Sequence, residues 1–118
     1  SNVAKMQRLG VSENLLNMYG AVSEAVVESM ASAARRLAKS NYALAISGVA
    51  GPGGGTPAKP VGTVCIALAG DDPKNQADSI IQKRTFHFCG DRDMVRDRSA
   101  KMALSMLRFH LLGKPLPF

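Results

Sequence analysis

Residues 45–62 read Ala-Ile-Ser-Gly-Val-Ala-Gly-Pro-Gly-Gly-Gly-Thr-Pro-Ala-Lys-Pro-Val-Gly, and the rest of the chain is organised around this stretch. An apolar run over 42–46 stops at Ser47-Gly48, and a second apolar run resumes over 63–69. Glycine permits positive φ and the close approach of a ligand, whereas proline fixes φ and removes a hydrogen-bond donor. The pattern therefore predicts a strand, a long shaped loop and a second strand.

This glycine-rich loop has two interpretations, a plain connection or a ligand site. Loops of this length without their own structure are uncommon in compact domains and are often functional. The loop also follows a strand end, where open α/β sheets bind ligands. The amides of Gly53, Gly54 and Gly55 are candidates for an anion-binding nest, and Lys59 adds a positive charge. No Gly-Lys-[Ser/Thr] ending or dinucleotide fingerprint is present, so the motif itself indicates only a small anionic ligand.

The composition fits one domain with its own core, since the 118 residues are 46% apolar. Fifteen Lys and Arg against nine Asp and Glu give a net charge of +6, which suits a phosphorylated ligand. The basic residues form no run and do not alternate with aromatic residues, so nucleic acid is not expected as a partner.

Metal, membrane and secretion signals are missing from the sequence. Cys65 and Cys89 lack zinc spacing, so we expect neither a metal nor a cofactor, and Cys65 is interpreted as core filler. No apolar run approaches the roughly 20 residues of a membrane span, and no signal-peptide pattern is present. We therefore expect a cytoplasmic protein without a membrane partner.

Helices are predicted on both sides of the strand–loop–strand unit. Two short helical pieces are expected, over 3–9 and over 12–18 with Ser12 as N-cap, followed by a longer helix capped by Ser23 and a final helix between Asp91 and Gly113. The apolar stripe of the longer helix comprises Val26, Val27, Met30, Ala33, Ala34 and Leu37, and that of the final helix comprises Val95, Met102, Ala103, Met106, Leu107 and Leu111.

The strand pattern predicts a sheet under these helices. The run over 42–46 is apolar throughout, as buried central strands are. A half-exposed strand over 78–88 is expected to pair with 63–69 as an antiparallel hairpin through a turn at 70–75, with Ile80, Phe86 and Phe88 on one face. The expected fold is a three-layer α/β sandwich, in which helices cover the sheet.

Four polar side chains are candidate site residues. Arg92 and Arg96 lie in the first turns of the final helix, where the helix dipole disfavours cations. They either bind a phosphate together with the helix N–H groups or pair with the nearby Asp91, Asp93 or Asp97. Ser47 ends a strand and either contacts a ligand, acts as a nucleophile or is a solvated strand end. Lys5 by itself is a surface residue of a short helix.

The segment 47–64 resembles the signature of the CinA C-terminal domain family. Three further segments agree with family patterns. Residues 1–5 resemble the family pattern Tyr-Ser-Asn-x-x-Lys. Residues 19–24 resemble His-Gly-Ala-Val-Ser-Glu, with Tyr19 in place of His, and residues 88–96 resemble Phe-x-Gly-Asp-Arg-x-x-Val-Arg. Order and spacing hold over essentially the whole chain, so we interpret residues 1–118 as one CinA C-terminal-like domain.

The resemblance implies a nicotinamide-nucleotide amidohydrolase. Such an enzyme converts nicotinamide mononucleotide (NMN) to nicotinate mononucleotide and ammonia in pyridine-nucleotide salvage, without a metal. By the resemblance, Lys5 matches a lysine that activates the nucleophile, Ser47 matches a position that lines the site, and Arg92 matches an active-site arginine. The expected ligand-binding residues are Gly48, Gly51, Gly53, Gly54, Lys59 and Arg96.

One family segment has no counterpart in this sequence. The family pattern begins with Glu-Ser-Cys-Thr-Gly-Gly, which supplies the serine nucleophile together with a strand and a helix, whereas this sequence starts after it. We therefore expect a fragment of an active family member; the alternative is a non-catalytic nucleotide-binding module of the same fold. A sheet shortened in this way would leave apolar faces uncovered, so a homo-oligomer is expected.

Overall fold

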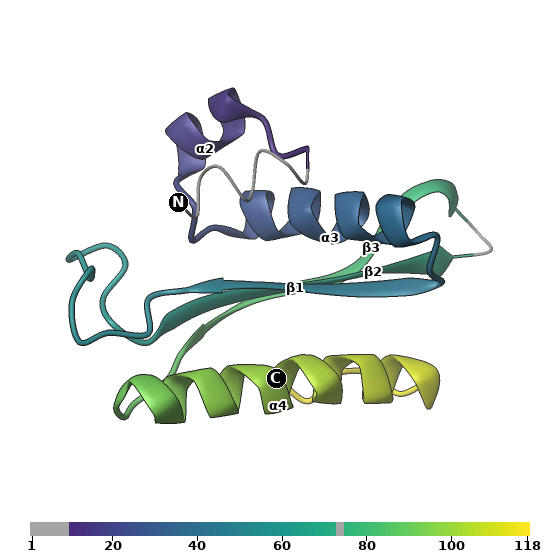
Figure 1. The fold of residues 1–118 in the computed structure, drawn as a ribbon. Helices are drawn as coiled ribbons and strands as arrows, with labels where there is room; N and C mark the ends of the chain where they lie inside the picture. Colours follow the sequence, from purple (N-terminus) through teal and green to yellow (C-terminus); the bar gives the residue numbers. More distant parts are fainter. Residues whose placement is uncertain (1–9, 73–74) are drawn as a thin grey trace.

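The computed structural model describes residues 10–72 and 75–118. Over these ranges the elements follow in the order α2 (Glu13–Tyr19), α3 (Glu24–Ala38), β1 (Tyr42–Gly48), β2 (Thr63–Asp72), β3 (Asn75–His87) and α4 (Arg92–Leu111). The strands form one antiparallel sheet in the order β1-β2-β3. Figure 1 shows α3 over one face of the sheet, with α2 beyond it on the same side, and α4 over the other face, which confirms the three-layer α/β prediction.

Each described helix begins at the cap residue that the sequence predicts. A side-chain oxygen of the cap accepts a hydrogen bond from a backbone N–H of the first turn and so satisfies a donor that the helix leaves free. The three capping pairs are Ser12 Oγ with Leu15 N (3.1 Å), Ser23 Oγ with Val26 N (3.2 Å) and Asp91 Oδ1 with Met94 N (2.9 Å). The helix predicted over 3–9 lies outside the described residues.

The central strand is β2, which is buried on both faces. Val64, Ile66 and Leu68 face α4, whereas Cys65, Ala67 and Ala69 face α3. The prediction that the run over 42–46 is a central strand is wrong, because β1 pairs only with β2 among the described residues and is an edge strand there. An apolar run indicates that side chains are buried, but it does not indicate how many neighbouring strands hydrogen-bond to the strand.

The hairpin of β2 and β3 is confirmed, but both strands extend into the segment 70–75 that was predicted as a turn. The strands run on to Asp72 and from Asn75. The predicted common face of β3 is also wrong. Leu68 pairs with Gln82 and the next residue, Ala69, pairs with Ile80, so a β-bulge leaves one extra residue in β3 and moves Ile80 to the α3 side.

Two predicted stripe residues are exposed. These are Leu37 and Leu111, which lie in the last turn of their helices. Two residues outside the predicted stripes, Ala31 and Ser99, are buried. Helical periodicity identifies the apolar side of a helix but does not show where the packing partner ends. The corrected stripes place α3 and α4 on the two faces of β2.

Candidate functional site

The glycine-rich loop (residues 49–62) continues the pairing of β1 with β2 before it turns away from the sheet. Val49 N donates to Thr63 O at 2.9 Å, and Gly62 N donates to Val49 O at 2.6 Å. These bonds hold the base of the loop at the end of β1. The loop is therefore a shaped extension of the sheet, as the glycine and proline pattern predicts.

The tip of the loop presents backbone amides to solvent. Gly53, Gly54 and Gly55 are exposed, and none of their N–H groups donates to a backbone acceptor within the described part of the chain. Gly54 has a φ of +92°, which glycine adopts without strain. A Cβ added at Gly53 would meet no atom within 4 Å. The three glycines are therefore exposed and their amides form no backbone hydrogen bond within the described residues, and the anion nest stays a prediction.

Arg92 contacts the loop directly. Its Nη1 donates to Gly51 O at 3.1 Å, although Gly51 is 41 residues away in the sequence. Gly51 is buried and has a φ of +85°. The first turn of α4 is therefore attached to the glycine-rich loop, and the guanidinium lies beside it.

Two of the three aspartates that could pair with these arginines have other partners. Asp91 caps α4, and the Asp97 carboxylate pairs with Lys101 at 2.8 Å. Within residues 10–72 and 75–118, neither Arg92 nor Arg96 forms an ion pair with Asp91, Asp93 or Asp97. Aspartate pairing thus does not explain why arginines occupy the first two turns of α4.

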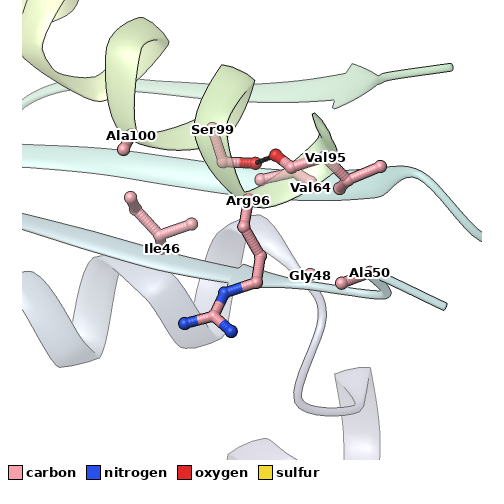
Figure 2. A pocket seen from close by; sticks show the side chains of 8 residues that line it. All are labelled: Ile46, Gly48, Ala50, Val64, Val95, Arg96, Ser99 and Ala100. Atoms are coloured by element: carbon pink, nitrogen blue, oxygen red, sulfur yellow. Dashed lines mark hydrogen bonds between the residues drawn. The ribbon is translucent and has the colours of Figure 1, made fainter. Parts of the chain in front are cut away.

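A cavity of about 240 Å³ lies between the end of β1 and the start of α4. Figure 2 shows the Arg96 side chain extending from α4 toward β1 at the side of this cavity. Ser99 Oγ donates to Val95 O at 2.6 Å, so its hydroxyl proton is engaged within the helix. The recess is apolar with one cation, which suits a ligand with a flat apolar part and an anionic group. It is lined by Ile46, Gly48, Ala50, Val64, Val95, Arg96, Ser99 and Ala100.

Ser47 lies on the opposite face of the sheet, toward α3. It pairs in register with Cys65, which in turn pairs with Thr85. Cys65 Sγ lies 3.5 Å from Thr85 Oγ1, and Thr85 Oγ1 donates to Glu24 Oε2 at 2.6 Å. Ser47 is a buried residue, and its hydroxyl forms no hydrogen bond with the part of the chain that the structure describes.

Sequence reasoning missed this row of side chains across the sheet. Glu24 and Thr85 were not candidate residues, although the hairpin register would have placed Thr85 beside Cys65. The N-cap prediction already put Glu24 in the first turn of α3. Their contact joins residues 61 positions apart, which no local pattern indicates.

Lys59 reaches α2 from the loop. Its Nζ donates to Tyr19 O at 2.7 Å, and a Cβ at Gly20 would lie 3.2 Å from it. The lysine therefore ties the loop to the junction of α2 and α3.

The structure thus divides the predicted site residues between the two faces of the sheet near the end of β1. Gly48, Gly51, Arg92 and Arg96 gather on the α4 side, whereas Ser47 is on the α3 side. Lys5 lies outside the described residues.

Burial raises the pKa of the Cys65 thiol above its ordinary value, with the negative charge of Glu24 acting in the same direction and Thr85 and Lys59 opposing both. A raised pKa means less thiolate at mildly alkaline pH than a free cysteine has, and the thiolate is the reactive form. We expect iodoacetamide at pH 8 to modify exposed Cys89 in the native protein and to spare Cys65. Peptide mass spectrometry after brief labelling measures both; equal labelling without denaturant would contradict the burial of Cys65.

The described ranges show neither a metal-binding cluster nor a helix that could span a membrane. Residues 10–72 and 75–118 contain no cluster of three or more His, Cys, Asp or Glu side chains that could hold a metal ion. None of the described helices is both long and apolar enough to cross a membrane.

Comparison with known proteins gives consistent results. The profile described as the CinA C-terminal domain matches residues 1–111. A CinA-like protein of Geobacter metallireducens is 49% identical over 113 residues, which is 96% of this chain and 26% of that protein. A CinA-like protein of Fervidobacterium nodosum is 46% identical over 92% of this chain and 25% of its own length. The chain therefore spans about a quarter of these curated relatives.

Solved structures agree in fold. The competence damage-inducible protein A of Klebsiella pneumoniae superposes with a TM-score of 0.81 at 35% identity, covering 95% of this chain and 65% of that one. A competence/damage inducible protein of Agrobacterium tumefaciens gives a TM-score of 0.80 at 33% identity, covering 91% and 62%. With the family profile matching 111 of its residues, this chain belongs to the CinA C-terminal domain family.

Proposed function

We propose that this domain binds NMN and, in the complete protein, hydrolyses its carboxamide. The observation that carries the proposal is the 3.1 Å hydrogen bond from Arg92 Nη1 to Gly51 O, because it holds a guanidinium beside a loop with exposed glycines. An arginine and backbone N–H groups together suit a phosphate. The apolar recess next to Arg96 suits the pyridine ring.

Amide hydrolysis needs a nucleophile, a base and donors for the oxyanion. The resemblance assigns the nucleophile to the serine of the Glu-Ser-Cys-Thr-Gly-Gly segment and its activation to Lys5. The serine oxygen would attack the carboxamide carbon, and the C–N bond would break as the NH2 group takes up the proton of the serine hydroxyl and leaves as ammonia. Water would then hydrolyse the ester to the carboxylate. Amides of Gly48, Gly51 and Gly53 are our candidates for contacts to the oxyanion or the ligand.

The test compares NMN with nicotinamide riboside, which lacks only the phosphate. We expect calorimetric titration to show much tighter binding of NMN, and an ammonia assay of the full-length protein to show turnover. Binding without ammonia release would favour the alternative, a non-catalytic nucleotide-binding module. Equal affinity for the two ligands would contradict a phosphate site at Arg92.

Arg92→Ala should weaken NMN binding by about tenfold or more, since a hydrogen bond to a charged group is worth about 1.5–3 kcal/mol. Arg98→Ala is the matched control, because Arg98 also lies on α4 and donates to a backbone carbonyl, that of Cys89, at 2.8 Å. The control should leave NMN affinity unchanged. Riboside affinity should be the same in both variants, and an Arg92→Ala variant whose preference for NMN over the riboside is undiminished would exclude this arginine as the phosphate ligand.

A further inference from the structure

The two halves of the glycine-rich loop are attached to different parts of the fold. Arg92 of α4 holds the first half through the carbonyl of Gly51. The second half is attached on the other side of the sheet, where Lys59 Nζ donates to Tyr19 O of α2 at 2.7 Å. Figure 1 shows the loop projecting beyond the sheet at the end where α3 begins. Each attachment is thus a cation that donates to a backbone carbonyl.

A closed turn presents Lys59. Thr56 N donates to Lys59 O at 3.0 Å, and Lys59 N donates to Thr56 Oγ1 at 3.0 Å, so the two ends of this turn bond to each other in both directions. In the described part of the chain, the bond from Lys59 to Tyr19 is the only hydrogen bond that joins residues 52–59 to anything outside the loop. Lys59 is therefore the polar attachment of the second half of the loop.

The junction of α2 and α3 has a shape that receives the ammonium group. Tyr19 is the last residue of α2, so its carbonyl oxygen is one that the helix leaves without a donor, and a cation is favoured at this end of a helix. Gly20 follows with a φ of +76°, and a Cβ there would lie 3.2 Å from Lys59 Nζ. A free carbonyl and a missing side chain thus meet at one point, 40 residues from the lysine in the sequence.

We propose that Lys59 is a positioning residue of the ligand site. Its bond to Tyr19 holds residues 52–59 against the junction of α2 and α3, so the amides of Gly53, Gly54 and Gly55 are set in place before a ligand binds. Glycine leaves this segment much conformational freedom, and ordering it only on binding would cost affinity. This role differs from the ligand contact that the sequence predicts for Lys59. The effect on NMN rests on the proposed function, whereas the effect on the loop does not.

Limited proteolysis of the complete protein tests the attachment without any ligand. Lys59→Met keeps the aliphatic stem and removes the donor, so we expect proteinase K to cut within residues 49–62 several-fold faster, because a protease cuts a segment that has left its folded position. Lys83→Met is the matched control, since it removes the same charge and the ion pair with Glu28 on the sheet. It should leave cleavage of the loop unchanged. Peptide mass spectrometry identifies the bonds that are cut.

The affinities for NMN and nicotinamide riboside test the positioning role. Lys59→Met should reduce the preference for NMN over the riboside several-fold, because displaced amides no longer meet the phosphate, and Lys83→Met should not. Gly20→Ala crowds the ammonium group and should reduce the preference as well. Added to Lys59→Met, it should cause no further loss, since both changes act through one attachment. Additive losses would overturn the positioning role in favour of a direct contact between Lys59 and the ligand.

The two measurements separate this inference from the proposed function. Unchanged cleavage of the loop in Lys59→Met, or an undiminished preference for NMN, would overturn the positioning role even if the unmodified protein binds NMN. Faster cleavage in Lys59→Met, together with no binding of NMN by the unmodified protein, would confirm the attachment and overturn the assignment of NMN.

Discussion

Replacing Ile66 with alanine is expected to lower the free energy of unfolding by about 2–5 kcal/mol, as deletions from a packed core do. Ile66 is 0% exposed in the middle of β2 and belongs to the cluster that includes Val95 and Met106 of α4. The loss has two parts, the transfer of the deleted methyl groups and the cavity left between sheet and helix. Urea unfolding followed by circular dichroism measures it.

Ile46→Ala is the matched control for this experiment. Ile46 is the cross-strand partner of Ile66 on the same face of the sheet, but it is 39% exposed at the edge strand β1. Its truncation should cost clearly less than that of Ile66, since part of the Ile46 side chain is already exposed to solvent and less buried surface is removed. Similar losses for the two variants would show that the edge of the sheet is covered and would contradict the description of β1 as an edge.

Gly62→Ala is expected to destabilise the fold through the backbone. Gly62 has a φ of +98°, and a Cβ there would lie 2.0 Å from Phe88 O. The strained φ alone costs on the order of 1–3 kcal/mol, and relief of the clash must separate Phe88 from Gly62. Phe88 N donates to Gly62 O at 2.8 Å, so this bond between the loop and the end of β3 would be lost.

Gly53→Ala is the control in the same loop. Its φ is not in the left-handed region, and an added Cβ meets no atom within 4 Å, so stability should change by less than about 0.5 kcal/mol. Thermal unfolding of the two variants side by side gives the comparison. A Gly62→Ala protein as stable as Gly53→Ala would mean that the base of the loop is not held at Phe88.

The two loop glycines also separate stability from binding. Gly53→Ala keeps the backbone N–H but adds a methyl group beside the candidate anion-binding amides, so it can hinder the proposed NMN binding without affecting the fold. Gly62→Ala should weaken the proposed NMN binding only because it displaces the whole loop. Comparing affinity with unfolding for both variants therefore distinguishes a ligand contact from a structural position.

Signals that act over a few residues were sufficient to predict much of this protein. The caps Ser12, Ser23 and Asp91 predicted where three helices begin, because capping joins residues three apart. The glycine and proline content of 45–62 predicted the long loop, and the apolar runs on either side predicted β1 and β2. The quoted segments were enough to identify the CinA family.

Only the tertiary structure decided how these parts meet. The bulge that moves Ile80, the edge position of β1 and the separation of Ser47 from Arg92 by the sheet depend on pairing between strands. The contacts of Arg92 with Gly51 and of Thr85 with Glu24 join residues 41 and 61 positions apart. Local sequence patterns carry no information on such contacts, because packing and strand pairing between distant segments bring them together.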